Sequence, residues 1–138
     1  MSADSQSPIG VLVMAYGTPD SPEDVERYYT HIRRGRAPDP ELLVELQDRY
    51  NAIGGISPLL AITRAQVDGI ATALEAAEPG RFVTALGQKH SAPFIEDGVA
   101  ELLKLGVERI VGIVLAPHFS TMSIAQYAAR AVTAADGL

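Results

Sequence analysis

The stretch Ile9-Gly10-Val11-Leu12-Val13-Met14-Ala15 is apolar throughout and is followed at once by the polar turn Tyr16-Gly17-Thr18-Pro19. Such a run is typical of a strand that is covered on both faces, as in a parallel sheet. The pattern occurs twice more, because 82–87 ends in Gln88-Lys89-His90-Ser91 and 110–116 ends in Pro117-His118-Phe119-Ser120-Thr121. Since the carboxyl ends of parallel strands share one edge, these polar groups are predicted to line a ligand-binding crevice.

Helical patterns separate the three predicted strands. The starts Ser21-Pro22 and Asp39-Pro40 each place a capping residue before a proline and acidic residues, as at helix N-termini. We expect helices from 22 to about 34, from 40 onward, from 57 to about 79, from 93 to about 106 and over 123–135. The third helix is predicted to bury the stripe Leu59, Leu60, Thr63, Val67, Ile70, Ala71 and Leu74. The alternation predicts an α/β fold with an open parallel sheet and right-handed crossovers.

Composition limits the classes of function. The chain has 138 residues, enough for one domain, and its net charge of −6 argues against a general affinity for nucleic acid or for an anionic membrane surface. It has no cysteine, which excludes disulfides and cysteine-ligated metal in this chain. We see no signal-peptide pattern and no apolar run near the ~20 residues of a membrane span. We therefore expect a cytoplasmic protein with a flexible segment 1–8 and a domain over 9–138.

Two features are candidates for anion and metal binding. Arg33-Arg34-Gly35-Arg36 is a basic island in an acidic chain, and Arg49 could join it across a helix hairpin. Arginine binds carboxylates and phosphates through two parallel hydrogen bonds, although a solvated helix C-terminus would carry the same residues. Tyr16 follows the first strand, where its phenolic oxygen could ligate haem iron or could belong to a hydrogen-bonded core tyrosine.

Histidine and serine give weaker signals. His90 and His118 follow the second and third strands and could bind metal, move protons or bond to loop backbone. Lys89 could pair with an anionic substrate or face solvent. Ser57, after Gly54-Gly55, could help to hold an anion at a helix N-terminus or could serve only as the cap.

Several long strings together resemble bacterial ferrochelatases. The chain segments that carry the resemblance are Val11-Leu12-Val13-Met14-Ala15-Tyr16-Gly17-Thr18-Pro19, Glu26-Arg27-Tyr28-Tyr29-Thr30-His31-Ile32-Arg33-Arg34-Gly35-Arg36, Asp48-Arg49-Tyr50, Ile53-Gly54-Gly55-Ile56-Ser57-Pro58-Leu59, Lys89-His90, Pro93-Phe94-Ile95-Glu96-Asp97 and Leu115-Ala116-Pro117-His118-Phe119-Ser120-Thr121. They run from about Gly10 to about Arg130, nearly the whole chain. The tyrosine at position 16, between Ala15 and Gly17, resembles the residue that coproporphyrin-type enzymes of this family carry there.

The resemblance implies a fold and a reaction. It implies one of the two Rossmann-like, three-layer domains of the type II chelatase fold, with porphyrin held between the domains. The implied enzyme is a lyase of haem biosynthesis that inserts Fe(II) into coproporphyrin III and requires no cofactor beyond these two substrates. Tyr16 would be the axial ligand of the product iron. The porphyrin would be lined by Arg33, Arg49, Tyr50, Ser57 and Tyr127, with Lys89 and His90 nearby.

The chain also departs from the family pattern. Family members are about twice as long, and their metal-binding histidine and glutamate lie in the second half, so we assign no catalytic residue here and do not give His118 that role. The partner expected from the resemblance is the C-terminal domain. Two alternatives stay open. One is a porphyrin-binding half-domain without turnover. The other is a short homodimeric enzyme resembling the cobaltochelatases, which use paired histidines, here His90 and His118.

The resemblance generates a first prediction. The purified 138-residue chain should insert no Fe(II) into coproporphyrin III above a blank of metal and porphyrin, because the family's histidine and glutamate are not in it. The formation of iron coproporphyrin, followed by visible absorbance under anaerobic conditions, measures this directly. A rate clearly above the blank would contradict the prediction.

Overall fold

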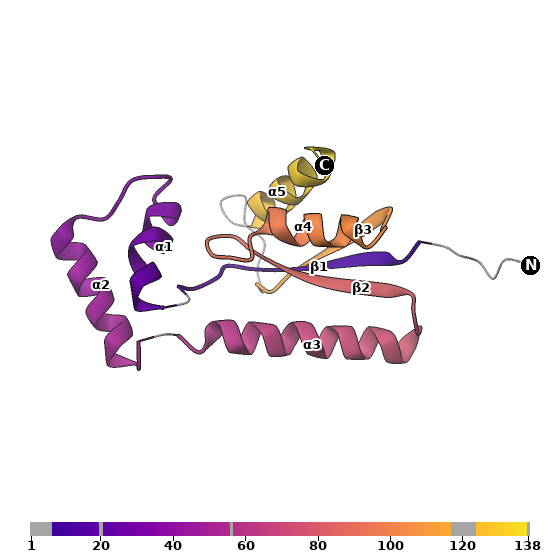
Figure 1. Ribbon diagram of the computed structural model, residues 1–138, viewed down its shortest axis with the longest axis horizontal. Coiled ribbons are helices and arrows are strands. Elements are labelled where there is room, and N and C mark those ends of the chain that lie inside the picture. The colour runs from indigo at the N-terminus through magenta and orange to yellow at the C-terminus, as the bar shows by residue number, and fades with distance from the viewer. Residues whose placement is uncertain (1–6, 20, 56, 117–123, 138) are drawn as a thin grey trace, which may run out of the picture.

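A computed structural model describes residues 7–19, 21–55, 57–116 and 124–137, so most of the predicted flexible segment 1–8 lies outside the described residues. Three parallel strands form one sheet in the order β2-β1-β3 (Figure 1). They are β1 (Ile9–Ala15), β2 (Phe82–Gln88) and β3 (Arg109–Val114). The predicted open parallel α/β sheet is confirmed.

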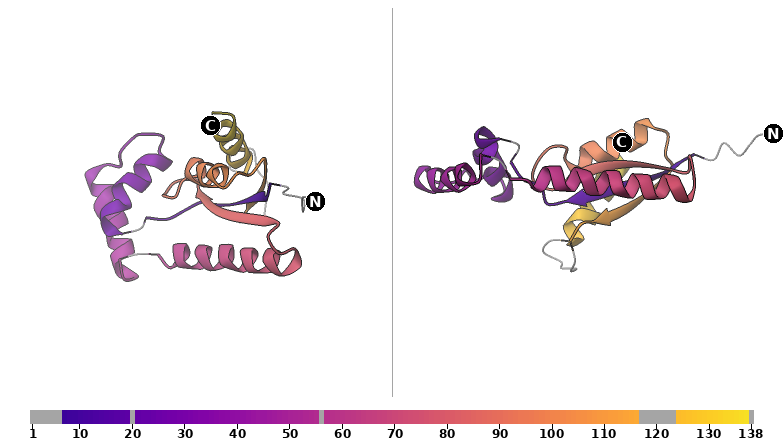
Figure 2. Two further views of the ribbon diagram at one scale, coloured as in Figure 1. Left: turned by 45° about the vertical axis from the view of Figure 1, so that its right-hand side comes forward. Right: turned by 90° about the horizontal axis from the view of Figure 1, so that it is seen from below.

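Helices lie on both faces of this sheet and beside it. Helix α3 (Leu59–Ala77) lies along one face, and α4 (Ile95–Lys104) and α5 (Ile124–Gly137) lie on the other, which gives the expected three layers (Figure 1). A short 3-10 turn (Pro22–Asp24), α1 (Val25–Ile32) and α2 (Pro40–Ala52) project beyond the sheet (Figure 2). Since β1 runs toward this projection, α1 and α2 stand at the carboxyl ends of the strands.

No helix in the described ranges combines the length and apolar character that crossing a membrane would need.

The core lies between β1 and the helices α4 and α5. Leu12 of β1 has no exposed surface and packs with Ile95, Val99 and Leu102 of α4. Helix α4 comes very close to the sheet because it carries Gly98 at the contact. A methyl group on Gly98 would lie 2.8 Å from the carbonyl oxygen of Leu86 and 2.6 Å from Leu12. The glycine therefore allows this packing distance.

The predicted stripe on α3 is less buried than expected. Thr63 is its one fully buried member, and Leu59 is 42% exposed, which makes the expectation for Leu59 wrong. The reason lies in the sheet, which is only three strands wide on the described residues. Helix α3 packs on β2 and leaves the β3 side of that face open, where Val111 and Ile113 are exposed.

Several element ends differ from the predictions by one to three residues, among them those of α1 and β3. Helix α1 ends at Ile32, because Arg34 adopts a positive φ of 58° and Gly35 one of 92°. The Gly35 amide then bonds back to the Thr30 carbonyl at 2.9 Å, the geometry of a glycine-capped helix end. Strand β3 ends at Val114 rather than at 116.

The two helical glycines Gly98 and Gly69 provide a matched test of this packing. Gly98→Ala should lower the free energy of unfolding by about 1–3 kcal/mol, because the new methyl group meets the sheet backbone. Gly69→Ala in α3 meets nothing within 4 Å and should raise it by about 0.5–1 kcal/mol through helix propensity. Urea unfolding of the two variants checks this, and equal effects at both sites would contradict the packing.

Candidate functional site

A cavity of about 440 Å³ opens at the carboxyl edge of the sheet. We refer to it as the edge cavity. Its walls come from the ends of β1 and β2, the end of α1 and the first turns of α5. The lining residues are Tyr16, His31, Ile32, Arg34, Lys89, His90, Gln126 and Arg130. The structure thus brings together Tyr16, Lys89 and His90, as predicted from the strand ends.

Tyr16 presents its ring to this cavity. The side chain is 44% exposed, and its ring meets the His90 ring edge-on with 4.7 Å between centroids. The backbone supports this contact, because the His90 amide donates to the Tyr16 carbonyl at 3.0 Å. Burial raises the pKa of the Tyr16 phenol above its ordinary value. The phenol is therefore protonated at neutral pH.

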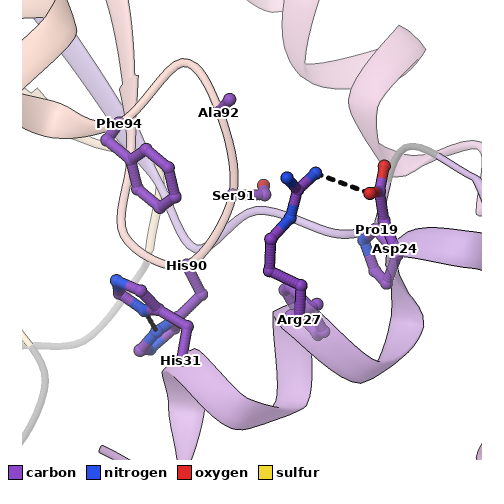
Figure 3. Close-up of a pocket in the computed structure, with 9 residues that line it drawn as sticks. Pro19, Asp24, Arg27, His31, His90, Ser91, Ala92 and Phe94 are labelled. Carbon is purple, nitrogen blue, oxygen red and sulfur yellow. Dashed lines mark hydrogen bonds and ion pairs between the residues drawn. The ribbon is translucent and has the colours of Figure 1, made fainter. Parts of the chain in front are cut away.

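His90 pairs with a histidine from another element. Its Nδ1 lies 2.9 Å from Nδ1 of His31 on α1, and the His31 ring stacks on Phe94 (Figure 3). One of the two nitrogens donates and the other accepts, so at least one ring must be neutral. Desolvation, and then the neighbouring His31 and Lys89, lower the pKa of His90 to about 4. The pair is consequently uncharged at neutral pH.

The two histidines also form the wall of a second, smaller pocket. This pocket has a volume of about 130 Å³ and lies on the side of His90 that faces Ser91 and Arg27 (Figure 3). Arg27 forms an ion pair there with Asp24 on the same stretch of chain. Since the pocket is small and its charges are paired, we place the candidate site in the edge cavity.

Lys89 is a largely buried cation. It is 7% exposed, and its ammonium group lies over the Tyr127 ring, 5.4 Å from the centroid. Desolvation, Arg130 and Arg34 lower the pKa of Lys89. Tyr127 itself is almost fully buried under Lys89, and burial raises its pKa to about 12. Tyr127 thus supports the floor of the site rather than projecting into the edge cavity.

The remaining predicted residues do not line the edge cavity. Arg33 follows the last residue of α1, and Arg49 on α2 is exposed and ion-paired with Glu45 at 2.7 Å. Desolvation and then the neighbouring Tyr50 raise the pKa of Tyr29 to about 12. The Ser57 hydroxyl accepts from the Leu59 amide at 3.1 Å, one residue before the N-cap of α3 at Pro58. Their contact with a porphyrin stays a prediction.

Five lining residues were not singled out as site residues from the sequence. They are His31, Ile32, Arg34, Gln126 and Arg130. Arg34 had a signal, since it lies in the basic island. His31 and Ile32 belong to a string that carries the family resemblance but had no assigned role, and Gln126 and Arg130 lie inside α5 with no local motif. His118, the second histidine predicted at the edge, lies outside the described residues. Among the described residues, no cluster of three or more histidine, aspartate or glutamate side chains could hold a metal ion.

Comparisons with known proteins give a consistent result. The family model "Ferrochelatase" matches residues 8–137. The chain is similar to coproporphyrin III ferrochelatases of Bacillus pumilus (56% identity over 131 residues), Bacillus subtilis (55% over 135) and Listeria monocytogenes (51% over 131). These matches cover 94%, 97% and 94% of this chain, and 42%, 44% and 42% of the relatives. The chain thus spans less than half the length of the curated relatives that it matches.

The low pKa of His90 generates a prediction on stability. A histidine in the unfolded chain titrates near 6.5, whereas the pKa of His90 in the folded chain is about 4. Between these values the unfolded state binds more protons, so stability falls as pH falls. From pH 7 to pH 5, His90 should account for roughly 1 kcal/mol of lost stability, a value reduced because the ring is partly in contact with solvent.

Two measurements check this. In an NMR titration the His90 ring protons should shift with a midpoint near 4, and near 6.5 in concentrated urea. In urea unfolding, His90→Asn should lose less stability than the parent chain between pH 7 and pH 5. A folded-state midpoint of 6 or higher would contradict the assignment.

Proposed function

Because the chain belongs to the ferrochelatase family, we propose that it forms the porphyrin-facing wall of a coproporphyrin III ferrochelatase. The proposed reaction places Fe(II) between the four porphyrin nitrogens and releases two pyrrole protons. The resemblance assigns iron uptake and proton removal to a histidine and a glutamate in the second half of the family, and the proposal keeps this assignment. The residues of this chain would bind and orient the macrocycle.

The observation that carries the proposal is the charge of the edge cavity. The chain has a net charge of −6, yet Arg34, Lys89 and Arg130 line the cavity, and no carboxylate of the described residues does. Arg130 is ion-paired with Glu96, which lies outside the lining. Coproporphyrin III carries four propionate groups, which guanidinium and ammonium groups bind through charge-assisted hydrogen bonds. The identity of 51–56% with relatives named coproporphyrin III ferrochelatase supports the same substrate class.

Tyr16 has the right chemistry for the face of a metalloporphyrin. Its oxygen belongs to an exposed ring at the edge cavity, and tyrosinate is a known axial ligand of haem iron. The raised pKa keeps the phenol neutral while the cavity holds no iron, and the charge of a bound ferric ion would lower that pKa. Tyr16 would then discriminate iron coproporphyrin from the metal-free macrocycle.

Of the alternatives, the homodimeric enzyme with paired histidines has less support. That hypothesis depended on His90 and His118, but the partner of His90 in the structure is His31 of the same chain. Light scattering tests it, because a stable dimer of the 138-residue chain would favour a shared cleft. The half-domain that binds porphyrin without turnover and the main proposal both predict porphyrin binding and no iron insertion by the 138-residue chain. Absorbance titration with coproporphyrin III therefore separates both of them from a chain that binds no porphyrin.

Replacement of Tyr16 tests the proposal with two ligands. Tyr16→Phe should weaken binding of ferric coproporphyrin III about tenfold, the loss of roughly 1.4 kcal/mol of ligation, and should shift its visible charge-transfer band. Binding of metal-free coproporphyrin III should change less than twofold, since Tyr16 has no iron to ligate there. Absorbance titration of both ligands measures this.

Tyr29→Phe is the matched control, because it removes the same hydroxyl from a tyrosine outside the edge cavity. Because its neighbour Tyr50 is a predicted contact of the macrocycle and not of the iron, it should affect both titrations equally and leave the difference between the two ligands as in the parent chain. If Tyr16→Phe left the ferric spectrum and affinity unchanged, iron ligation by Tyr16 would be wrong. If the parent chain bound neither porphyrin at micromolar concentration, the proposed porphyrin wall would be wrong.

A further inference from the structure

One arginine joins three parts of the molecule at the edge cavity. The guanidinium of Arg130 on α5 donates from Nη1 to the Lys89 carbonyl at 2.6 Å. Its Nη2 donates to both carboxylate oxygens of Glu96 on α4, at 2.6 and 2.9 Å, and its Nε lies 3.2 Å from one of them. We call this arrangement the Glu96–Arg130 clasp. It connects residues that lie 34 and 41 positions apart in the chain.

The clasp acts on the turn that carries two cavity residues. The amide of Lys89 donates to the Ala15 carbonyl at 2.9 Å, and the amide of His90 donates to the Tyr16 carbonyl at 3.0 Å. These bonds hold the turn to the end of β1. The carbonyl of Lys89 is held separately, by Arg130 from α5. The peptide between Lys89 and His90 is therefore fixed from both sides, and with it the direction of both side chains.

Glu96 does not line the edge cavity, so apart from the electrostatic field of its charge it acts on a ligand through Arg130. Arginine side chains have high rotamer entropy, and a two-oxygen carboxylate partner restrains the guanidinium to one plane. In that plane Nη1 reaches the Lys89 carbonyl. Without Glu96, the guanidinium could leave the carbonyl and turn toward the cavity or toward solvent.

We propose that Glu96 is a positioning residue for the porphyrin site, which commits Arg130 to the Lys89 carbonyl and so holds His90 against Tyr16 and Lys89 over Tyr127. This inference rests on the proposed function, since the edge cavity must bind the macrocycle for positioning to matter. Under this inference, Arg34 and Lys89 are the cations that would bind the propionates. Arg130 instead holds the backbone of the cavity wall.

The competing interpretation makes Arg130 itself a ligand of a propionate group, because it also lines the cavity. The two interpretations predict opposite signs for the same variant. Loss of the Glu96 carboxylate removes a negative charge and frees the guanidinium, so a direct ligand would bind the tetra-anionic porphyrin more tightly. If Arg130 acts as a clasp, the turn loosens and binding weakens despite the more positive potential.

The test uses Glu96→Ala with two controls in the 138-residue chain. Glu101→Ala removes the same charge from an exposed position of the same helix. Val107→Ala removes buried apolar atoms at the amino-terminal side of β3, far from the carboxyl edge, and lowers stability without touching the cavity. Affinity for metal-free coproporphyrin III, measured by absorbance titration at low temperature, should fall about fivefold in Glu96→Ala. It should change less than twofold in both controls.

A second readout needs no ligand. In Glu96→Ala the amide of His90 should exchange its hydrogen faster than in the parent chain, and the His90 ring protons should lose part of the shift caused by the Tyr16 ring. Neither should change in Glu101→Ala. These NMR measurements separate the inference from the proposed function, because they can succeed or fail whether or not the chain binds porphyrin.

Three outcomes would overturn the inference. One is tighter or unchanged porphyrin binding by Glu96→Ala, and another is an equal loss in Val107→Ala, which would show a general effect of stability. The third is unchanged His90 exchange and ring shifts in Glu96→Ala. Faster exchange and lost ring shifts in a chain that fails to bind porphyrin would support the clasp and contradict the proposed function alone.

Discussion

The site depends on the parallel pairing of β1 with a strand on each side. Because β1 is hydrogen-bonded to β2 and to β3 in the same direction, the ends of all three strands come to one edge of the sheet. The pairing continues past the strands, since the Lys89 amide bonds to Ala15 and the Leu115 amide bonds to Met14. Residues that leave the strands at this edge therefore start from fixed backbone positions. The edge cavity follows from this geometry.

Burial decides the charge of the groups that meet there. Desolvation raises the pKa of Tyr16 and lowers that of His90 and His31, so the aromatic side of the cavity is neutral at physiological pH. The cationic side consists of Arg34, Lys89 and Arg130. The proposed function would use this division, with the neutral side against the macrocycle and the cationic side against its propionates.

The helical projection of α1 and α2 is attached to the sheet edge at a few points. The Tyr28 hydroxyl donates to the Gly17 carbonyl at 3.0 Å, and His31 contacts both His90 and Phe94. These contacts explain why α1 contributes to the edge cavity while α2 does not. Arg49, on α2, accordingly lies outside the cavity with its own ion pair to Glu45. A porphyrin that contacts it would have to extend beyond the edge cavity toward the projection.

The sequence by itself determined the strands, the helices and the gathering of Tyr16, Lys89 and His90 at one edge. Continuous apolar runs and capping signals are local patterns, and the side-by-side placement of strand ends follows from parallel topology alone. The family was also evident from long ordered strings. Only the tertiary structure decided that His31 is the partner of His90, that Arg130 bridges Glu96 and Lys89, and that Leu59 is exposed. These facts depend on how helices that are distant in the sequence pack against the sheet. A local sequence pattern carries no information on such long-range packing.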